Sequence, residues 1–122
     1  MKELKILVID DDPEQVEILK TILTSEGRKI TTCTKSRDAL EMIQSEKFDL
    51  VLTDVSMPEV DGVQILKFTK QHSPETEVVP ITAFGDWGVY AEALRLGAKD
   101  FINKPYSIPE IQGLVARISS AK

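Results

Sequence analysis

The chain has 122 residues, of which 42% are hydrophobic and 29% are charged, a balance typical of one globular domain rather than of a disordered or fibrous protein. Lys and Arg number 15 against 20 Asp and Glu, and the resulting net charge of −5 argues against direct binding to nucleic acid or to an anionic membrane. The single cysteine, Cys33, excludes an internal disulfide and a thiolate zinc cluster. No apolar run approaches the roughly 20 residues that a membrane span needs, so we expect a soluble, cytoplasmic protein in which residues 1–122 form a single domain.

Short apolar runs alternate along the chain with amphipathic stretches, beginning with the run Ile6–Ile9, which is typical of a strand covered on both faces. Asp12 and Pro13 then favour the start of a helix, because Asp is a good N-cap and Pro fits the first helical turn. Apolar side chains follow at helical spacing as far as Gly27, which predicts the stop of this helix. A β-branched run at residues 29–34 predicts the second strand.

The alternation continues with a second helix, which we expect Ser36 to cap. Further strands are predicted at residues 50–53, 78–82 and 100–103, and further helices at residues 63–73, at residues 87–96 before Gly97, and after the cap Ser107. Pro80 lies inside the fourth strand, where we expect it to remove one ladder hydrogen bond at a cost of about 1 kcal/mol. Strands and helices in strict alternation, five of each, predict a parallel sheet with right-handed crossovers and helices on both faces.

Side chains that can do chemistry stand at the predicted strand ends: Asp10 and Asp11 after the first strand, Asp54 after the third, Thr82 at the end of the fourth, and Lys104 after the fifth. Because the carboxyl ends of parallel strands meet at one edge of the sheet, we expect these side chains to converge. Helix capping explains one Asp or Thr there, but not three carboxylates, a hydroxyl and a lysine on one rim. Clustered carboxylates repel one another unless a cation is present, and oxygen ligands without His or Cys suit Mg²⁺. A carboxylate beside Mg²⁺ and a lysine is suited to accepting a phosphoryl group.

Four segments carry a family resemblance: residues 6–13 (ILVIDDDP), 49–62 (DLVLTDVSMPEVDG), 81–84 (ITAF) and 96–105 (LGAKDFINKP). From about Leu4 to Ile118 the chain resembles the response-regulator receiver domains of two-component signal transduction. The resemblance implies a flavodoxin-like, doubly wound α/β fold with a five-stranded parallel sheet of order 2-1-3-4-5 and five helices. It also implies that residues 1–122 are one receiver domain, with no effector domain in this chain.

The resemblance further implies a role for each residue at the strand ends. Asp54 matches the phosphoacceptor that becomes an aspartyl phosphate, and Lys104 matches the lysine that contacts the phosphoryl group. Asp11 matches a direct Mg²⁺ ligand and Asp10 one that reaches the metal through water. The carbonyl of Ser56 matches a backbone ligand, so the implied metal set also includes Asp54.

A switch is implied as well, because Thr82 matches the hydroxyl that responds to phosphorylation and Phe101 the aromatic residue that changes rotamer with it. The surface of the fourth helix, fifth strand and fifth helix then changes. The implied partners are a sensor histidine kinase or histidine phosphotransfer protein and a downstream partner or output domain, with room for a phosphorylation-dependent dimer. The domain is therefore expected to be a signalling switch that catalyses only its own phosphorylation and dephosphorylation, and not an enzyme acting on a separate substrate.

Two other functions use similar chemistry. A Mg²⁺-dependent phosphatase with an aspartate nucleophile typically places a second acid two residues further on, but that position is Ser56. A flavin-binding module on this fold needs a Ser/Thr/Gly-rich phosphate loop after the first strand, where Asp10, Asp11 and Asp12 would repel a phosphate. Both alternatives are therefore disfavoured.

Structural roles are expected for several other residues that are capable of chemistry. We predict that Asp12 caps a helix, that Asp49 forms loop hydrogen bonds, and that Cys33 is a small buried residue. His72 is expected to be solvated at the end of a polar helix face. Trp87 is expected to cover the core from the fourth helix, although its exposure at a binding surface is the alternative. Phe101 can equally be a packing residue, and only the family match makes it a switch.

Overall fold

The computed structural model describes residues 3–25, 27–83 and 85–121, so Phe84, the last residue of the segment ITAF, lies outside the described residues. In chain order the elements are β1 (Leu4–Ile9), α1 (Pro13–Leu23), β2 (Arg28–Cys33), α2 (Ser36–Ser45), β3 (Leu50–Asp54), α3 (Gly62–His72), β4 (Glu77–Ala83), α4 (Trp87–Arg95), β5 (Ile102–Lys104) and α5 (Ile108–Ala121). All four strand pairs are parallel, and the sheet order is β2-β1-β3-β4-β5. The predicted fold class is confirmed.

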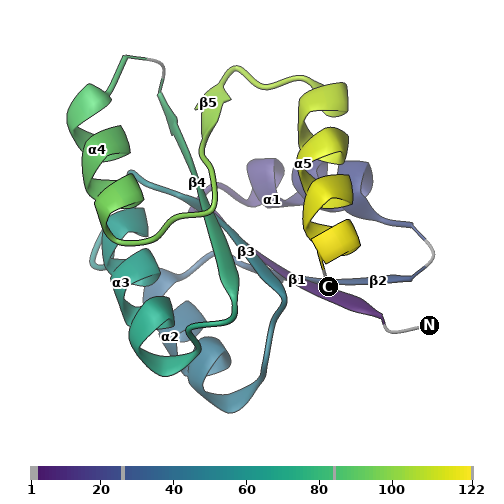
Figure 1. The fold of residues 1–122 in the computed structure, drawn as a ribbon, viewed down its shortest axis with the longest axis horizontal. Helices are drawn as coiled ribbons and strands as arrows, with labels where there is room; N and C mark the ends of the chain where they lie inside the picture. The colour runs from purple at the N-terminus through teal and green to yellow at the C-terminus, as the bar shows by residue number, and fades with distance from the viewer. Residues whose placement is uncertain (1–2, 26, 84, 122) are drawn as a thin grey trace.

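Helices cover both faces of the sheet (Figure 1), and a hydrophobic layer lies between the sheet and the helices on each face. Side chains of β1 alternate between the two layers: Ile6 and Val8 pack toward α1 and α5, while Leu7 and Ile9 pack toward α2 and α3. All four are at most 1% exposed. Burial of an aliphatic side chain of this size contributes about 1.5–3 kcal/mol, so the short apolar runs of the strands are a main source of stability. Double-sided burial is also the reason that these strands read as unbroken apolar runs.

The end of α1 differs from the prediction. The helix stops at Leu23, and Gly27, with a φ of +81°, instead turns the chain toward β2 and accepts a hydrogen bond from the Leu4 N–H. Side chains replace a glycine cap here, because the Arg28 guanidinium donates to the Leu23 carbonyl and the Gln112 amide to the Ile22 carbonyl. Because Arg28 belongs to β2 and Gln112 to α5, the end of α1 cannot be predicted from the sequence of the helix alone. Gly97, by contrast, ends α4 as predicted, with a φ of +97°.

Several other predicted boundaries differ from the observed ones by a residue or two, and two of the differences have a visible cause. Ser36 is the first residue of α2 rather than its cap; the N-cap is Lys35, without a side-chain hydrogen bond, and the Ser36 hydroxyl is bonded elsewhere. The last strand covers Ile102–Lys104 rather than residues 100–103. It starts late because the Phe101 N–H donates to the carboxylate of Asp100 and is therefore not available to the ladder. The cap at Ser107 is confirmed, since its hydroxyl accepts from the Glu110 N–H.

Pro80 disturbs the sheet less than the sequence implies. The Val55 N–H donates to the Ile81 carbonyl, so alternate residues of β4, including Pro80, direct their backbone groups away from β3 and toward β5. Strand β5 begins only at Ile102, the partner of Ile81. The nitrogen of Pro80 therefore faces the start of β5, just before the first paired residues Ile81 and Ile102. No hydrogen bond from the interior of the β4–β5 ladder is lost there.

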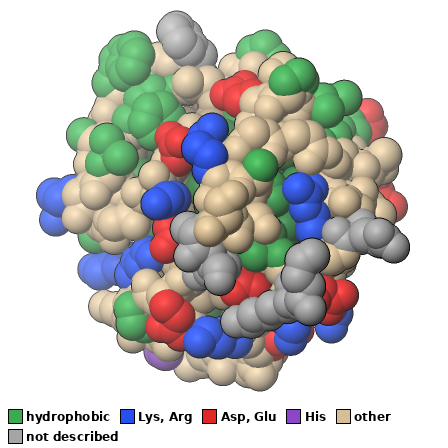
Figure 2. Space-filling view, turned by 45° about the vertical axis from the view of Figure 1, so that its right-hand side comes forward, with side chains coloured by type: hydrophobic (Ala, Val, Ile, Leu, Met, Phe, Trp, Pro, Cys, Tyr) green, Lys and Arg blue, Asp and Glu red, His purple; other side chains and the backbone are tan. Residues whose placement is uncertain are grey.

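The surface carries both charges side by side. On the face shown in Figure 2, Lys and Arg side chains lie among Asp and Glu side chains, with hydrophobic groups scattered between them. Within the part of the chain that the structure describes, no helix has the length and apolar character to cross a membrane.

Candidate functional site

The carboxyl edge of the sheet gathers the acidic residues and the lysine that the sequence singled out. Asp54 is the last residue of β3 and Lys104 the last of β5, while Asp10 and Asp11 directly follow β1. They line an open pocket of about 610 Å³, whose other walls are Asp12, Gln15, Pro105 and Tyr106. The expected convergence of these four residues is confirmed.

The three carboxylates stand close to one another and to a single ammonium group. One oxygen from each of Asp10, Asp11 and Asp54 lies within 4.8 Å of the others. Lys104 Nζ lies 3.2 Å from Asp54 Oδ1 and 3.8 Å from Asp10 Oδ2. Asp10 is only 3% exposed and Asp54 8%. Among the described residues that line the pocket, one cation, Lys104, faces four carboxylates, so the pocket is electronegative.

Burial and the neighbouring charges together change the pKa values of groups in this cluster. Burial, reinforced by the charge of Asp54, raises the pKa of Asp10 from 3.8 to about 6, against the opposing effects of a hydrogen bond from the Asp12 N–H and the charge of Lys104. Burial disfavours the charged form of Lys104, but its hydrogen bond to Asp54 and the charges of Asp54 and Asp10 outweigh that, and the pKa of the ammonium is raised. The lysine therefore stays protonated beside Asp54.

The donor set of the cluster fits a hard divalent cation. The ligand atoms are carboxylate oxygens alone, without imidazole or thiolate, which is the chemistry that Mg²⁺ prefers. Burial, and after it the charge of Asp54, raises the pKa of Asp10, and a bound cation would act in the opposite direction. Ser56 is an exposed residue of the β3–α3 loop and does not line the acidic pocket, so a role for its carbonyl stays a prediction.

The β3–α3 connection is packed tightly against the acceptor strand. A Cβ on Gly62 would stand 2.5 Å from the Asp54 carbonyl oxygen, so only glycine fits the first position of α3. The Gly62 N–H donates to the Val55 carbonyl. A capping box between Asp61 and Gln64 fixes the start of the helix. These contacts fix the backbone of Asp54 against the start of α3.

The two predicted switch residues lie beside the pocket and not in its wall. Thr82, 4% exposed, follows Ile81, which is the register partner of Asp54 on the neighbouring strand. Phe101 is half-buried, and its ring stacks on Tyr90 with centroids 4.2 Å apart. Tyr90, which the sequence interpretation missed, donates from its hydroxyl to the Ala83 carbonyl at the end of β4. One indication of this role was present in the sequence: Tyr90 lies three residues after Trp87 in a predicted helix, so the two rings lie side by side on it.

Two further pocket residues were missed. Tyr106 donates from its hydroxyl to Gln15 Oε1 over 3.3 Å, and the two side chains form the wall of the pocket between α1 and the β5–α5 loop. Burial raises the pKa of the Tyr106 phenol, so the hydroxyl keeps its proton. The proximity of Tyr106 to Lys104, and of Gln15 to Asp11, in sequence could have indicated both.

The structural roles expected for other residues are confirmed except for that of Trp87. Asp12 caps α1 by accepting from the Glu14 N–H, and Asp49 accepts from the Lys5 N–H. Cys33 is buried, and burial raises the pKa of its thiol. His72 is exposed at the end of α3. Trp87, however, is 64% exposed and contacts Tyr90 edge-on at 5.1 Å, because Tyr90, 5% exposed, is the aromatic residue of this turn that packs into the core.

Comparison with protein families identifies the family of this chain. The family model described as "Response regulator receiver domain" matches residues 6–116. The chain belongs to the response regulator receiver domain family. It is thus a phosphoacceptor domain of the kind that serves as a signalling switch in response regulators.

Curated relatives of this receiver domain are longer regulators. It is 34% identical over 116 residues to the response regulator protein PilR of Pseudomonas aeruginosa, covering 95% of this chain and 26% of PilR. It is 37% identical over 112 residues to the transcriptional regulatory protein ZraR of Escherichia coli strain K12, covering 92% and 25%. The chain thus spans about a quarter of the length of these relatives.

Solved structures agree with the fold. The BeF3-activated receiver domain of DrrB superposes with a TM-score of 0.88 at 27% identity, covering 97% of this chain and 98% of that chain. NtrX from Brucella abortus, solved with ADP, has a TM-score of 0.88 at 30% identity, covering 98% of this chain and 27% of that chain.

Proposed function

We propose that this receiver domain accepts a phosphoryl group on Asp54 from the phosphohistidine of a sensor histidine kinase or a histidine phosphotransfer protein. Mg²⁺ would be held by Asp10, Asp11, Asp54 and the carbonyl of Ser56. The observation that carries the proposal is the placement of Lys104 Nζ 3.2 Å from Asp54 Oδ1, at the edge of a cluster of three carboxylates.

The chain's own groups support an in-line transfer. A carboxylate oxygen of Asp54 forms the new bond to phosphorus while the bond from phosphorus to the histidine nitrogen breaks, and the imidazole leaves with the bonding electron pair. Lys104 is placed to hold one phosphoryl oxygen, and its raised pKa keeps it cationic for that purpose. A bound Mg²⁺ supplies neutralisation of the charge on the phosphoryl oxygens and on the carboxylates. The open pocket admits a donor side chain from another protein.

We further propose that the phosphoryl group is read by Thr82 and Phe101. Thr82 is the penultimate residue of β4 and follows the register partner of Asp54, and we expect its hydroxyl to bond a phosphoryl oxygen on Asp54. Movement of Thr82 would change the packing of Phe101 against Tyr90, and with it the surface of α4, β5 and α5. A downstream partner, an output domain or a second copy of the phosphorylated domain would bind that surface.

The acceptor is tested by incubating the protein with acetyl phosphate and Mg²⁺ and measuring the intact mass. One phosphoryl group should be added to the wild type and none to Asp54→Asn, because an amide is a poor nucleophile. The matched control is Asp49→Asn, which removes a buried carboxylate at the opposite end of the sheet and should label normally. Undiminished labelling of Asp54→Asn, or equal labelling with and without EDTA, would contradict the proposal.

A further inference from the structure

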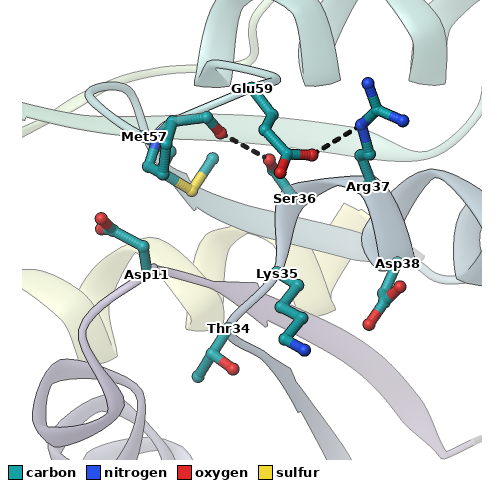
Figure 3. A pocket seen from close by; sticks show the side chains of 9 residues that line it. Asp11, Thr34, Lys35, Ser36, Arg37, Asp38, Met57 and Glu59 are labelled. Atoms are coloured by element: carbon teal, nitrogen blue, oxygen red, sulfur yellow. Dashed lines mark hydrogen bonds and ion pairs between the residues drawn. The ribbon is translucent and has the colours of Figure 1, made fainter.

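The hydroxyl of Ser36 joins α2 to a distant loop. It donates to the Pro58 carbonyl over 3.0 Å and accepts from the Val60 N–H over 3.2 Å, bonds that span 22 and 24 residues of sequence. Ser36 is only 6% exposed. Figure 3 shows the side chain at the start of α2, directed at the β3–α3 loop. Since Lys35 is the N-cap of α2, helix capping does not account for this hydroxyl.

The loop segment that Ser36 holds has an unfavourable backbone conformation. Glu59 has a φ of +68°, in the left-handed region that residues other than glycine seldom occupy, and the Val60 N–H donates to the Pro58 carbonyl across it. Such a conformation persists only where the surrounding structure enforces it. Ser36 contacts both ends of this turn, and the neighbouring Arg37 pairs with the Glu59 carboxylate, Nε to Oε2, at 2.6 Å (Figure 3). Two successive residues of α2 therefore hold the turn.

This turn lies in the loop that carries the proposed backbone ligand. Ser56 stands two residues before it, and the loop is otherwise anchored where the Gly62 N–H donates to the Val55 carbonyl. Between these anchors, Met57, Pro58 and Glu59 border an open pocket of about 340 Å³ that reaches Asp11. The loop thus borders open space on that side, although Met57 and Val60 pack against the core. A carbonyl ligand cannot be re-aimed by a side-chain rotation, so its direction depends on how the loop backbone is held.

We propose that Ser36 is a positioning residue of the phosphoacceptor site, which fixes the β3–α3 loop so that the Ser56 carbonyl is oriented for Mg²⁺. The inference rests on the proposed function. Removal of the hydroxyl leaves the Pro58 carbonyl and the Val60 N–H without their side-chain partner, and the turn at Glu59 keeps only its own hydrogen bond and the exposed ion pair with Arg37. The metal site then has to be ordered when the ion binds rather than beforehand.

The test compares Ser36→Ala with Ser36→Thr, which restores a hydroxyl at the same position. The matched control is Thr76→Val, because the Thr76 hydroxyl is also buried and also joins distant segments, donating to the Phe48 carbonyl at the opposite end of the sheet. Two quantities are measured on each protein: the Mg²⁺ dissociation constant by titration calorimetry, and the hydrogen exchange rate of the Val60 amide without metal. The exchange rate reports on the loop independently of any metal chemistry.

We expect Ser36→Ala to raise the Mg²⁺ dissociation constant about tenfold, the size typical of losing a group that orients a metal ligand. The Val60 amide should exchange about tenfold faster in the same variant, since one of its acceptors is lost. Ser36→Thr should stay close to the wild type in both measurements. Thr76→Val should lower the melting temperature while leaving both quantities unchanged.

A folded Ser36→Ala variant with wild-type Mg²⁺ affinity would overturn the inference, as would an equally weakened Ser36→Thr variant. Equal loss of affinity in Thr76→Val would show that general destabilisation is the cause, and would also overturn it. Failure of the proposed function is distinguishable, because the wild-type protein itself would then neither bind Mg²⁺ nor label at Asp54, which would overturn both.

Discussion

Asp10→Asn should stabilise the metal-free protein at neutral and alkaline pH. The pKa of Asp10 is about 6 in the folded protein against 3.8 ordinarily, and each pKa unit corresponds to about 1.4 kcal/mol, so the ionised carboxylate costs about 3 kcal/mol. This cost already includes the attraction to Lys104 at 3.8 Å. The amide keeps an oxygen that can accept from the Asp12 N–H, but its N–H donors beside the ammonium group offset part of the gain. We therefore expect a net gain of about 2 kcal/mol, which is a rise in melting temperature of roughly 6–10 °C for a domain of this size.

The gain should also depend on pH in a defined direction. Because the folded-state pKa is raised, the stability contributed by protonated Asp10 is complete below about pH 3.8 and is lost as the pH rises to about 6. The difference between Asp10→Asn and the wild type should thus be greatest above pH 6 and nearly vanish at pH 4. Added Mg²⁺ should stabilise the wild type and reduce the difference, since the ion offsets the charge that the amide removes.

Thermal unfolding followed by circular dichroism in EDTA, at pH values from 4 to 8, measures this effect. Asp12→Asn is the matched control, because it removes an exposed carboxylate from the same pocket while Asn caps a helix as well as Asp does. The control should change the melting temperature little at any pH. A destabilised Asp10→Asn protein at pH 8, or a gain that is independent of pH, would refute the reasoning.

Three other substitutions test the site, and a fourth, Gly88→Ala, is the control for the first of them. Gly62→Ala should destabilise the fold by about 2 kcal/mol and slow labelling, because its Cβ meets the Asp54 carbonyl at 2.5 Å. Gly88→Ala, in an exposed helical position with open space around it, should instead stabilise by about 0.5–1 kcal/mol; both effects are read from denaturant unfolding. Asp11→Ala should weaken Mg²⁺ binding by about tenfold or more in a calorimetric titration, and unchanged affinity would remove this residue from the ligand set. Thr82→Ala should still be phosphorylated but should lose the change in Trp87 fluorescence on adding beryllofluoride, and a wild-type response would exclude the hydroxyl as the relay.

The fold and the position of the site were predictable because they depend on local patterns and on one topological rule. An apolar run such as Ile6–Ile9, or an amphipathic stretch such as the one that Asp12 caps, can be recognised within about a dozen residues of sequence. Strict alternation then requires a parallel sheet whose carboxyl ends share an edge. This rule alone placed Asp54 near Asp10 and Lys104 before any distance was known.

What the sequence by itself determined was therefore the set of elements and the residues at the carboxyl edge of the sheet, while the order of the strands was implied by the family resemblance. Only the tertiary structure decided that the Ser36 hydroxyl bonds the β3–α3 loop, that Trp87 is 64% exposed, and that Asp10 is buried deeply enough to raise its pKa. Each of these depends on which distant segment packs against the residue. A hydroxyl at a helix start satisfies its hydrogen bonds with whatever lies nearest, and for Ser36 the nearest groups belong to Pro58 and Val60, more than twenty residues away along the chain.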